Sequence, residues 1–154
     1  MITNINKIIF LDFDGVITTW DTNFRLNKDK LVLLGKIIEA TDCSLIISSS
    51  WRSYDVSSTI EKLSDEMDYY NNHMKFPFCD RIIGITDRLR RFSSDCRGTE
   101  IKKWIEANKY KGKYAILDDD RDMLEEQLPF FINTDQMYGL SEENVKKAIN
   151  ILNN

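Results

Sequence analysis

Short apolar runs recur along the chain and alternate with segments in which apolar residues return every three or four positions. The short runs lie near residues 7–11, 44–47, 81–85, 113–117 and 130–133, and their length and apolar character are typical of buried strands. The periodic segments predict amphipathic helices between them. This alternation predicts an α/β fold, in which a parallel sheet of about five strands is covered by helices on both faces.

Capping residues place the ends of two predicted helices. Asn27 can cap a helix that runs to about residue 40, and Ser141, with Asn144 three residues later, marks the start of the final helix. A third periodic segment predicts a helix over residues 99–108. We expect the apolar faces of these helices to pack on the sheet and to form the core.

The size and composition of the chain fit one globular domain, and we expect residues 1–154 to form it. The 154 residues are 42% hydrophobic and 30% charged, which is ordinary for a folded domain of this length. No apolar run approaches the roughly 20 residues of a membrane helix, so we expect no membrane association. The amino terminus lacks the pattern of a secretory signal, which predicts a cytoplasmic protein.

Charge and cysteine content narrow the possible chemistry. The net charge of -4 argues against a broad electrostatic surface for nucleic acid. A local basic patch or a merely solvated face remains open for the arginines of the middle of the chain, which are Arg81, Arg88, Arg90, Arg91 and Arg97. The three cysteines are odd in number and lack metal-ligand spacing, so they predict free thiols.

Polar residues follow the first apolar run abruptly. Asp12 and Asp14 are separated by one residue, so they point to the same side if the extended geometry of the strand persists. Two carboxylates in one place repel each other, which implies a divalent cation or a shared proton. Gly15 then permits a tight turn that holds them at the edge of the sheet.

Two further apolar runs end in the same way. Residues 48–50 are three serines, and residues 118–120 are three aspartates. Each group alone reads as an ordinary turn, because these residue types are common in loops. Three polar endings after three predicted parallel strands form a pattern, since the carboxyl ends of such strands line one edge of the sheet.

These residues resemble the haloacid dehalogenase (HAD) superfamily of phosphohydrolases with an aspartate nucleophile. Residues 10–16 look like its first motif, residues 46–49 like its second and residues 116–119 like its fourth, in the family's order. The resemblance implies a three-layer, Rossmann-like fold and spans nearly the whole chain.

A narrower resemblance is to the small HAD domain of "Swiss army knife" RNA-repair proteins. It rests on residues 48–52, on residues 97–101 with Trp104, and on residues 139–141. The intervals 17–26 and 53–96, where the superfamily inserts cap domains, are short. The chain therefore resembles a capless member with an open site, which implies a phosphorylated RNA or DNA end, or a nucleotide, as substrate.

The resemblance also implies a mechanism. Asp12 would attack phosphorus and form an aspartyl-phosphate, while Asp14 would protonate the leaving oxygen and later activate water. Mg²⁺ would be held by Asp12, the backbone carbonyl of Asp14, Asp118 and Asp119, an all-oxygen set that suits this cation. Asp118 is preferred as direct ligand, with Asp119 in support and Asp122 as an alternative.

The second motif would supply contacts to the substrate phosphate. Ser48 or Ser49 would donate a hydrogen bond to a phosphate oxygen, and Ser48 is favoured because it is the first polar residue after the strand. Arg52 would either reach the same phosphate or pair with a surface carboxylate. Alone, the serines would read as turn or cap residues.

The third motif of the superfamily is a basic residue, usually lysine, at a helix start. Arg97 occupies that place and is assigned the role here, with Lys102 and Lys103 as alternatives. Arginine keeps the charge but is not interchangeable with lysine. This departure and the open site leave a rival function open, a binding or regulatory domain with little turnover. A phosphotransferase that uses the same aspartate is also open, because it shares the first half of the reaction.

Overall fold

The computed structural model describes residues 5–70, 75–89 and 95–154, without the side chains of residues 65–70. Arg90 and Arg91 of the expected basic patch lie outside these residues. The described elements, in chain order, are β1 (Lys7–Leu11), β2 (Thr18–Thr19), a 3₁₀ turn (Trp20–Thr22), β3 (Arg25–Leu26), α1 (Lys28–Thr41), β4 (Ser44–Ile47), α2 (Val56–Tyr70), a 3₁₀ turn (Cys79–Arg81), β5 (Ile82–Ile85), α3 (Arg97–Ala107), β6 (Lys113–Asp118), a 3₁₀ helix (Glu125–Phe130), β7 (Phe131–Asn133) and α4 (Glu142–Asn153).

The main sheet has five parallel strands in the order β5-β4-β1-β6-β7. The predicted fold class is therefore confirmed. Each predicted strand is present, with small differences at the ends: β5 begins at Ile82, β6 continues to Asp118 and β7 begins at Phe131. β1 lies at the centre, paired with β4 on one side and with β6 on the other.

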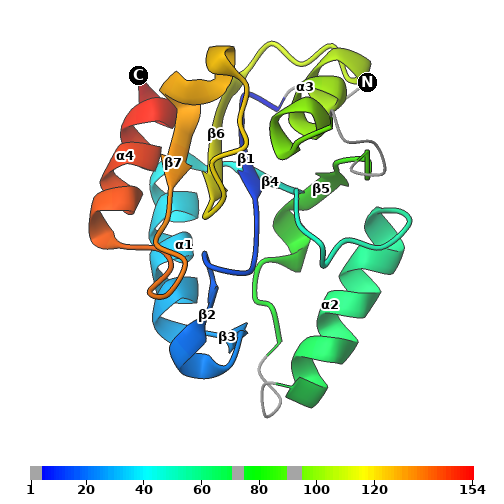
Figure 1. The fold of residues 1–154 in the computed structure, drawn as a ribbon, viewed down its shortest axis with the longest axis vertical. Coiled ribbons are helices and arrows are strands. Elements are labelled where there is room, and N and C mark those ends of the chain that lie inside the picture. Colours follow the sequence, from blue (N-terminus) through cyan, green and yellow to red (C-terminus); the bar gives the residue numbers. More distant parts are fainter. Residues whose placement is uncertain (1–4, 71–74, 90–94) are drawn as a thin grey trace.

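Side chains of the central strand alternate between two cores, as a sheet covered on both faces requires. Ile9 and Leu11 join the larger core with residues of α1 and α4. Phe10 faces the opposite way and packs edge-on against Trp104 of α3, with ring centroids 5.5 Å apart. The helices α1 and α4 accordingly lie on one side of the sheet and α3 on the other (Figure 1).

The helix ends follow local hydrogen bonding. The Asn27 side chain accepts from the Asp29 amide, and the Ser141 side chain accepts from the Asn144 amide, so both predicted caps are confirmed. The helix predicted over residues 99–108 begins two residues earlier, at Arg97.

A short hairpin, formed by β2 and β3, fills the interval between β1 and α1. Neither strand was predicted, because two residues are too few to carry a period-2 pattern. No large cap domain lies over the sheet in the described part of the chain. None of the helices described is long and apolar enough to cross a bilayer.

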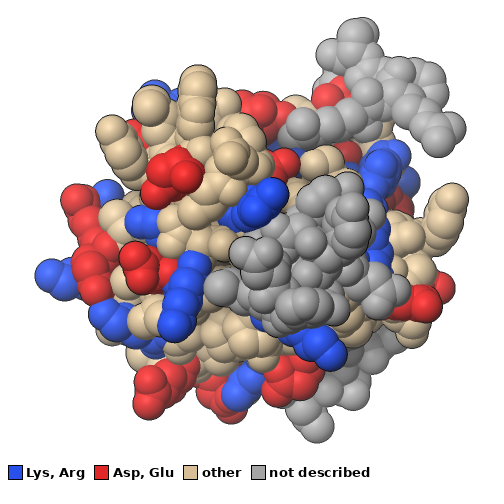
Figure 2. Space-filling view, turned by 90° about the horizontal axis from the view of Figure 1, so that it is seen from below, with Lys and Arg blue, Asp and Glu red and all other residues tan. Residues whose placement is uncertain are grey.

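The carboxyl ends of the strands meet at the edge of the sheet beside this hairpin (Figure 1). Figure 2 views the molecule from that side and shows acidic and basic side chains interspersed among other residues. The described part of this face therefore carries no broad field of one sign.

We expect Gly98→Ala to lower the free energy of unfolding by about 1–3 kcal/mol, which is typical of overpacking. An added Cβ would lie 2.6 Å from the backbone nitrogen of Leu124 and 3.0 Å from Cα of Met123, so α3 would be pushed from the loop after β6. Urea denaturation measures the change. Lys103→Ala, an exposed position on the same helix, should stay within about 0.5 kcal/mol of wild type; equal stability of both variants would contradict the argument.

Candidate active site

Three carboxylates meet at the centre of this edge. Oxygens of Asp12, Asp118 and Asp119 lie within 4.8 Å of one another. The sheet register causes this meeting, because Leu11 pairs with Leu117 and the next residue of each strand is an aspartate. The Asp12 amide continues the ladder by donating to the Leu117 carbonyl at 3.0 Å.

Burial and mutual repulsion raise the pKa of these carboxyl groups and so favour their protonated forms. Burial, with the nearby charge of Asp118, raises the pKa of Asp12 to about 8, against a lowering effect of Arg97. Burial likewise raises the pKa of Asp118 to about 6, and the pKa of Asp119 is raised by the same cause. A cation among them would favour the ionised forms, and an all-oxygen donor set suits a hard divalent ion such as Mg²⁺.

Gly15 is needed where the turn after β1 passes Asp119. Its φ is +76°, and an added Cβ would lie 2.4 Å from the Asp119 Oδ2 atom. A side chain at this position would therefore displace one of the three carboxylates.

Arg97 is the buried cation beside the cluster. Its Nε donates to Asp118 Oδ2 at 3.1 Å, and its Nη2 lies 3.8 Å from Asp12 Oδ1. Its Nη1 donates to Glu100 Oε2 at 3.3 Å, one helical turn along α3. The three nitrogens of one guanidinium thus address three different carboxylates, a geometry that the planar fork of arginine permits.

The alternatives to Arg97 point away from the cluster. Lys102 is exposed and pairs with Glu126 at 2.9 Å, and Lys103 is exposed with Asp87 at 3.7 Å. Asp122 serves the start of α3 instead of the carboxylate cluster, because its Oδ2 accepts from the Arg97 amide at 3.0 Å. The geometry therefore leaves Arg97 as the basic residue at the site.

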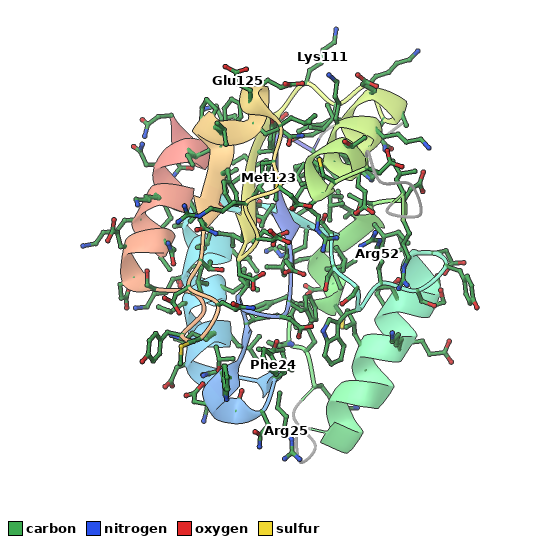
Figure 3. The ribbon with its side chains drawn as sticks, in the orientation of Figure 1. Phe24, Arg25, Arg52, Lys111, Met123 and Glu125 are labelled. Atoms are coloured by element: carbon green, nitrogen blue, oxygen red, sulfur yellow. The ribbon has the colours of Figure 1, made fainter. Side chains whose placement is uncertain are left out.

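Two roles were expected for Arg52, a contact with substrate phosphate or a pair with a surface carboxylate, and the structure pairs it with a carboxylate that is buried, Glu100. Arg52 is 3% exposed, and its Nη2 donates to the buried Glu100 at 3.0 Å, while its Nη1 donates to the Ser49 carbonyl at 2.6 Å. Figure 3 shows Arg52 between β5 and the start of α2. Its guanidinium is therefore paired with a carboxylate inside the protein, and Glu100 bridges Arg52 and Arg97.

The side chain of Asp14 leaves the cluster, contrary to the expectation that it points with Asp12. The extended geometry ends at Phe13, whose carbonyl accepts from the amides of residues 16–18 in a tight turn. The Asp14 Oδ1 atom accepts from the Thr18 hydroxyl at 2.7 Å and from the Trp51 indole at 3.0 Å. The Asp14 carboxylate is thus held by Thr18 and Trp51, two residues to which the sequence analysis assigned no role.

The serines divide their roles. The Ser49 side chain lies near enough to Asp12 to lower the pKa of that carboxyl, and its Oγ accepts from the Trp51 amide at 3.2 Å. Ser48 turns to the residue after β5, where its Oγ accepts from the Thr86 hydroxyl at 3.3 Å. Ser49 is therefore the hydroxyl beside Asp12, whereas Ser48 was favoured from the sequence.

Three residues of the site carried no assignment from the sequence: Thr18, Trp51 and Glu100. Glu100 lies three residues after Arg97, a spacing that puts the two on one helix face and could have revealed the pair. No periodicity marks Thr18 or Trp51, because their roles depend on how two separate loops meet.

Comparison with known proteins adds one finding. The family model described as "HAD domain in Swiss Army Knife RNA repair proteins" matches residues 8–145. That match covers all the residues of the cluster and of its surroundings. Neither a curated protein nor a solved structure gives a significant match.

We expect the contribution of this cluster to stability to fall as the pH of metal-free protein rises from about 5 to 8. Native Asp12 holds its proton up to about pH 8, whereas the unfolded chain releases it near the ordinary value of 3.8. The native state thus binds more protons in this window, and the slope of unfolding free energy against pH is negative. Each such group contributes at most about 1.4 kcal/mol per pH unit.

The same experiment tests the cation. Mg²⁺ favours the ionised cluster, so it should raise the melting temperature most at pH 8, relative to protein in EDTA. Asp118→Asn should abolish that increase, while the exposed Asp29→Asn should keep it. If Mg²⁺ left the melting temperature of the wild-type protein unchanged at pH 8, this assignment would be contradicted.

Arg97→Lys should lower the free energy of unfolding in EDTA by about 1–3 kcal/mol, although charge is conserved. A single ammonium cannot reach the three carboxylates that the guanidinium contacts. The matched control is Lys102→Arg, whose exposed pair with Glu126 can be kept. Urea denaturation compares the two, and a wild-type value for Arg97→Lys would refute the three-way contact.

Proposed function

The chain belongs to the haloacid dehalogenase superfamily, in the group of HAD domains described from Swiss Army Knife RNA repair proteins, and from this premise we propose that it is a Mg²⁺-dependent phosphomonoesterase. The observation that carries the proposal is the meeting of Asp12, Asp118 and Asp119 beside Arg97. Family membership supports a hydrolase, and the carboxylate set supports a divalent cation.

In the proposed first step, a carboxylate oxygen of Asp12 attacks phosphorus and forms an aspartyl-phosphate. The bond from phosphorus to the ester oxygen breaks, and that oxygen takes a proton from Asp14. Thr18 and Trp51 hold Asp14 in place for this transfer. Because both donate to its Oδ1, the other oxygen is the one positioned to carry the proton.

In the second step, water attacks the aspartyl-phosphate and Asp14 takes its proton. Phosphate is released, and Asp12 and Asp14 return to their starting states. Ser49 and Arg97 lie beside Asp12 and are proposed to contact the phosphate oxygens through both steps. Asp12, Asp118 and Asp119, with the Asp14 carbonyl, would hold Mg²⁺, which would supply positive charge for those oxygens.

Arg52 is given an indirect role in this proposal. Its guanidinium binds Glu100 and the Ser49 carbonyl, so it fixes the Ser49 loop against α3. We assign Arg52 to positioning and not to direct phosphate binding.

The description of the matching family suggests the substrate class. It refers to RNA repair, which supports a phosphorylated RNA or DNA end, or a nucleotide, as substrate. Between β1 and α1 the chain forms only the small β2–β3 hairpin, and this small insertion supports a substrate larger than a free metabolite.

One observation favours a second function, a binding or regulatory domain with little turnover. Arg97 stands where the superfamily usually has lysine, and its nitrogens already contact Asp118 and Glu100. Slow turnover of every phosphomonoester with tight retention of a ligand would favour this reading. Transfer of the phosphoryl group to an acceptor other than water shares the first step and would appear as acceptor-dependent turnover.

Asp12→Asn is expected to lower hydrolysis of p-nitrophenyl phosphate by at least about 10³-fold, because the amide cannot form the covalent intermediate. EDTA should have the same effect on the wild-type enzyme, and Asp29→Asn should retain activity. Full activity in Asp12→Asn would refute the nucleophile.

Asp14→Asn should behave differently with the same substrate. Nitrophenolate leaves without a proton, so the aspartyl-phosphate still forms, but its hydrolysis lacks a general base. Rapid quenching should reveal a nitrophenol burst and accumulated phosphoenzyme, which Asp12→Asn cannot show. A variant without burst or phosphoenzyme would contradict the assigned division of roles.

A further inference from the structure

A cleft of about 420 Å³ opens beside Asp14, and the proposed reaction assigns no part of the substrate to its space. Its lining comes from three separate segments: Phe24 of the hairpin turn, Ser50 and Trp51 of the loop after β4, and Lys62 of α2, together with Asp14 itself. The volume falls in the range of pockets for small organic groups. Two aromatic rings and one cation therefore stand next to the proposed acid of the reaction.

Trp51 is fixed on the side of the cleft nearest to the reaction. Its indole nitrogen donates to Asp14 at 3.0 Å, and its ring packs on Phe13, with centroids 6.0 Å apart. A flat group stacked on the free part of Trp51 would thus lie directly beside Asp14. Only the indole nitrogen of Trp51 holds Asp14, so the proposed reaction gives the face of the ring no role.

Phe24 is held at the cleft by an unusual backbone. Asn23 and Phe24 have φ values of +53° and +56°, a conformation that bulky residues rarely adopt. The Phe24 amide donates to the Thr19 carbonyl at 2.9 Å, which closes the turn. The ring remains 43% exposed and lies between the hairpin and α2 (Figure 3). The turn therefore presents an aromatic ring to solvent at the site.

We propose that this cleft binds the terminal nucleoside of a single-stranded, phosphorylated oligonucleotide, with its base stacked on Phe24 and Trp51. The inference rests on the proposed phosphatase function, since it assigns the part of the substrate beyond the reacting phosphate. Stacking on aromatic rings is how proteins hold unpaired bases without reading their sequence.

Lys62 lies where this cleft meets a second one, which gives a strand room beyond its terminal nucleoside. It lines that second cleft, of about 450 Å³, together with Tyr54 and Arg88, so the two clefts adjoin at this lysine. Arg88 is anchored there, because its Nη2 donates to the Ser50 carbonyl at 2.9 Å. Lys62 is placed to contact the next phosphate of the strand, and Arg88 and Tyr54 continue the path.

The charge of the protein favours this mode over a purely electrostatic one. With a net charge of -4 and interspersed signs on this face (Figure 2), a few cations cannot alone retain a polyanion. Base stacking supplies the affinity that the charges do not. A peptide phosphorylated on serine or threonine, or an aliphatic phosphomonoester, would leave the aromatic pair without a flat partner.

The test compares ends that differ only in the terminal base. Short single-stranded RNA and DNA with 3′- or 5′-phosphate ends are assayed with Mg²⁺ beside the same strands with an abasic terminal residue, and beside glycerol 2-phosphate. We expect the end with a base to have a kcat/KM about ten-fold higher than its abasic counterpart, through KM. The four phosphorylated strands identify the sugar and the end that fit.

Phe24→Ala should reduce that ten-fold preference to near unity, and Phe24→Trp should restore it. The matched control is Trp20→Ala, which removes an aromatic ring of the same hairpin that is 61% exposed and is not part of the cleft lining. Lys62→Gln should weaken binding of strands more than of mononucleotides and reduce the salt dependence. Lys146→Gln, on the exposed surface of α4, should leave both unchanged.

The outcomes separate this inference from the proposed function. Hydrolysis that requires Asp12 but treats abasic and base-bearing ends alike would overturn the subsite and keep the phosphatase. If no substrate is hydrolysed, fluorescence anisotropy of labelled strands still decides: weaker binding by Phe24→Ala and by abasic ends supports the subsite, and equal binding overturns it. Preference for a phosphopeptide over every strand would also overturn it.

Discussion

The central constraint of this protein is the burial of like charges at the edge of its sheet. Asp12, Asp118 and Asp119 form the cluster, and beside it Glu100 pairs with Arg52 and Arg97, so the four carboxylates and two guanidiniums leave two negative charges when all are ionised. That excess equals the charge of one divalent cation. Burial raises the pKa of Asp12 and Asp118. Without a cation, the two carboxyl groups therefore retain protons, and this reduces the repulsion.

The surrounding structure is organised to hold this arrangement. Parallel pairing of β1 with β6 brings the two strand-end aspartates together, and the close approach of Gly98 to the loop after β6 sets the start of α3. Arg97 then enters the cluster from the first turn of that helix, with Glu100 on the same face. A change in any of these packing contacts would therefore reach the chemistry through the position of one guanidinium.

The sequence was sufficient for the fold and for the identity of the cluster, because both depend on local patterns. Strands and caps follow from periodicity and short-range hydrogen bonds, and Asp12 and Asp118 follow from strand ends in a parallel sheet. The side-chain directions of Asp14, Ser49 and Arg52 were not predictable, since each is decided by a turn or by a partner distant in sequence. The hairpin escaped prediction because its strands are too short to show a period.

The indole of Trp51 has a consequence for how the protein can be observed. Of the three tryptophans, Trp104 is in the core and Trp20 is 61% exposed, whereas Trp51 alone donates a hydrogen bond to a carboxylate of the site. Its excited state is polar and sensitive to a neighbouring negative charge. The molecule thus carries a built-in optical reporter, through which protonation or occupancy near Asp14 can be followed in unlabelled protein and in real time.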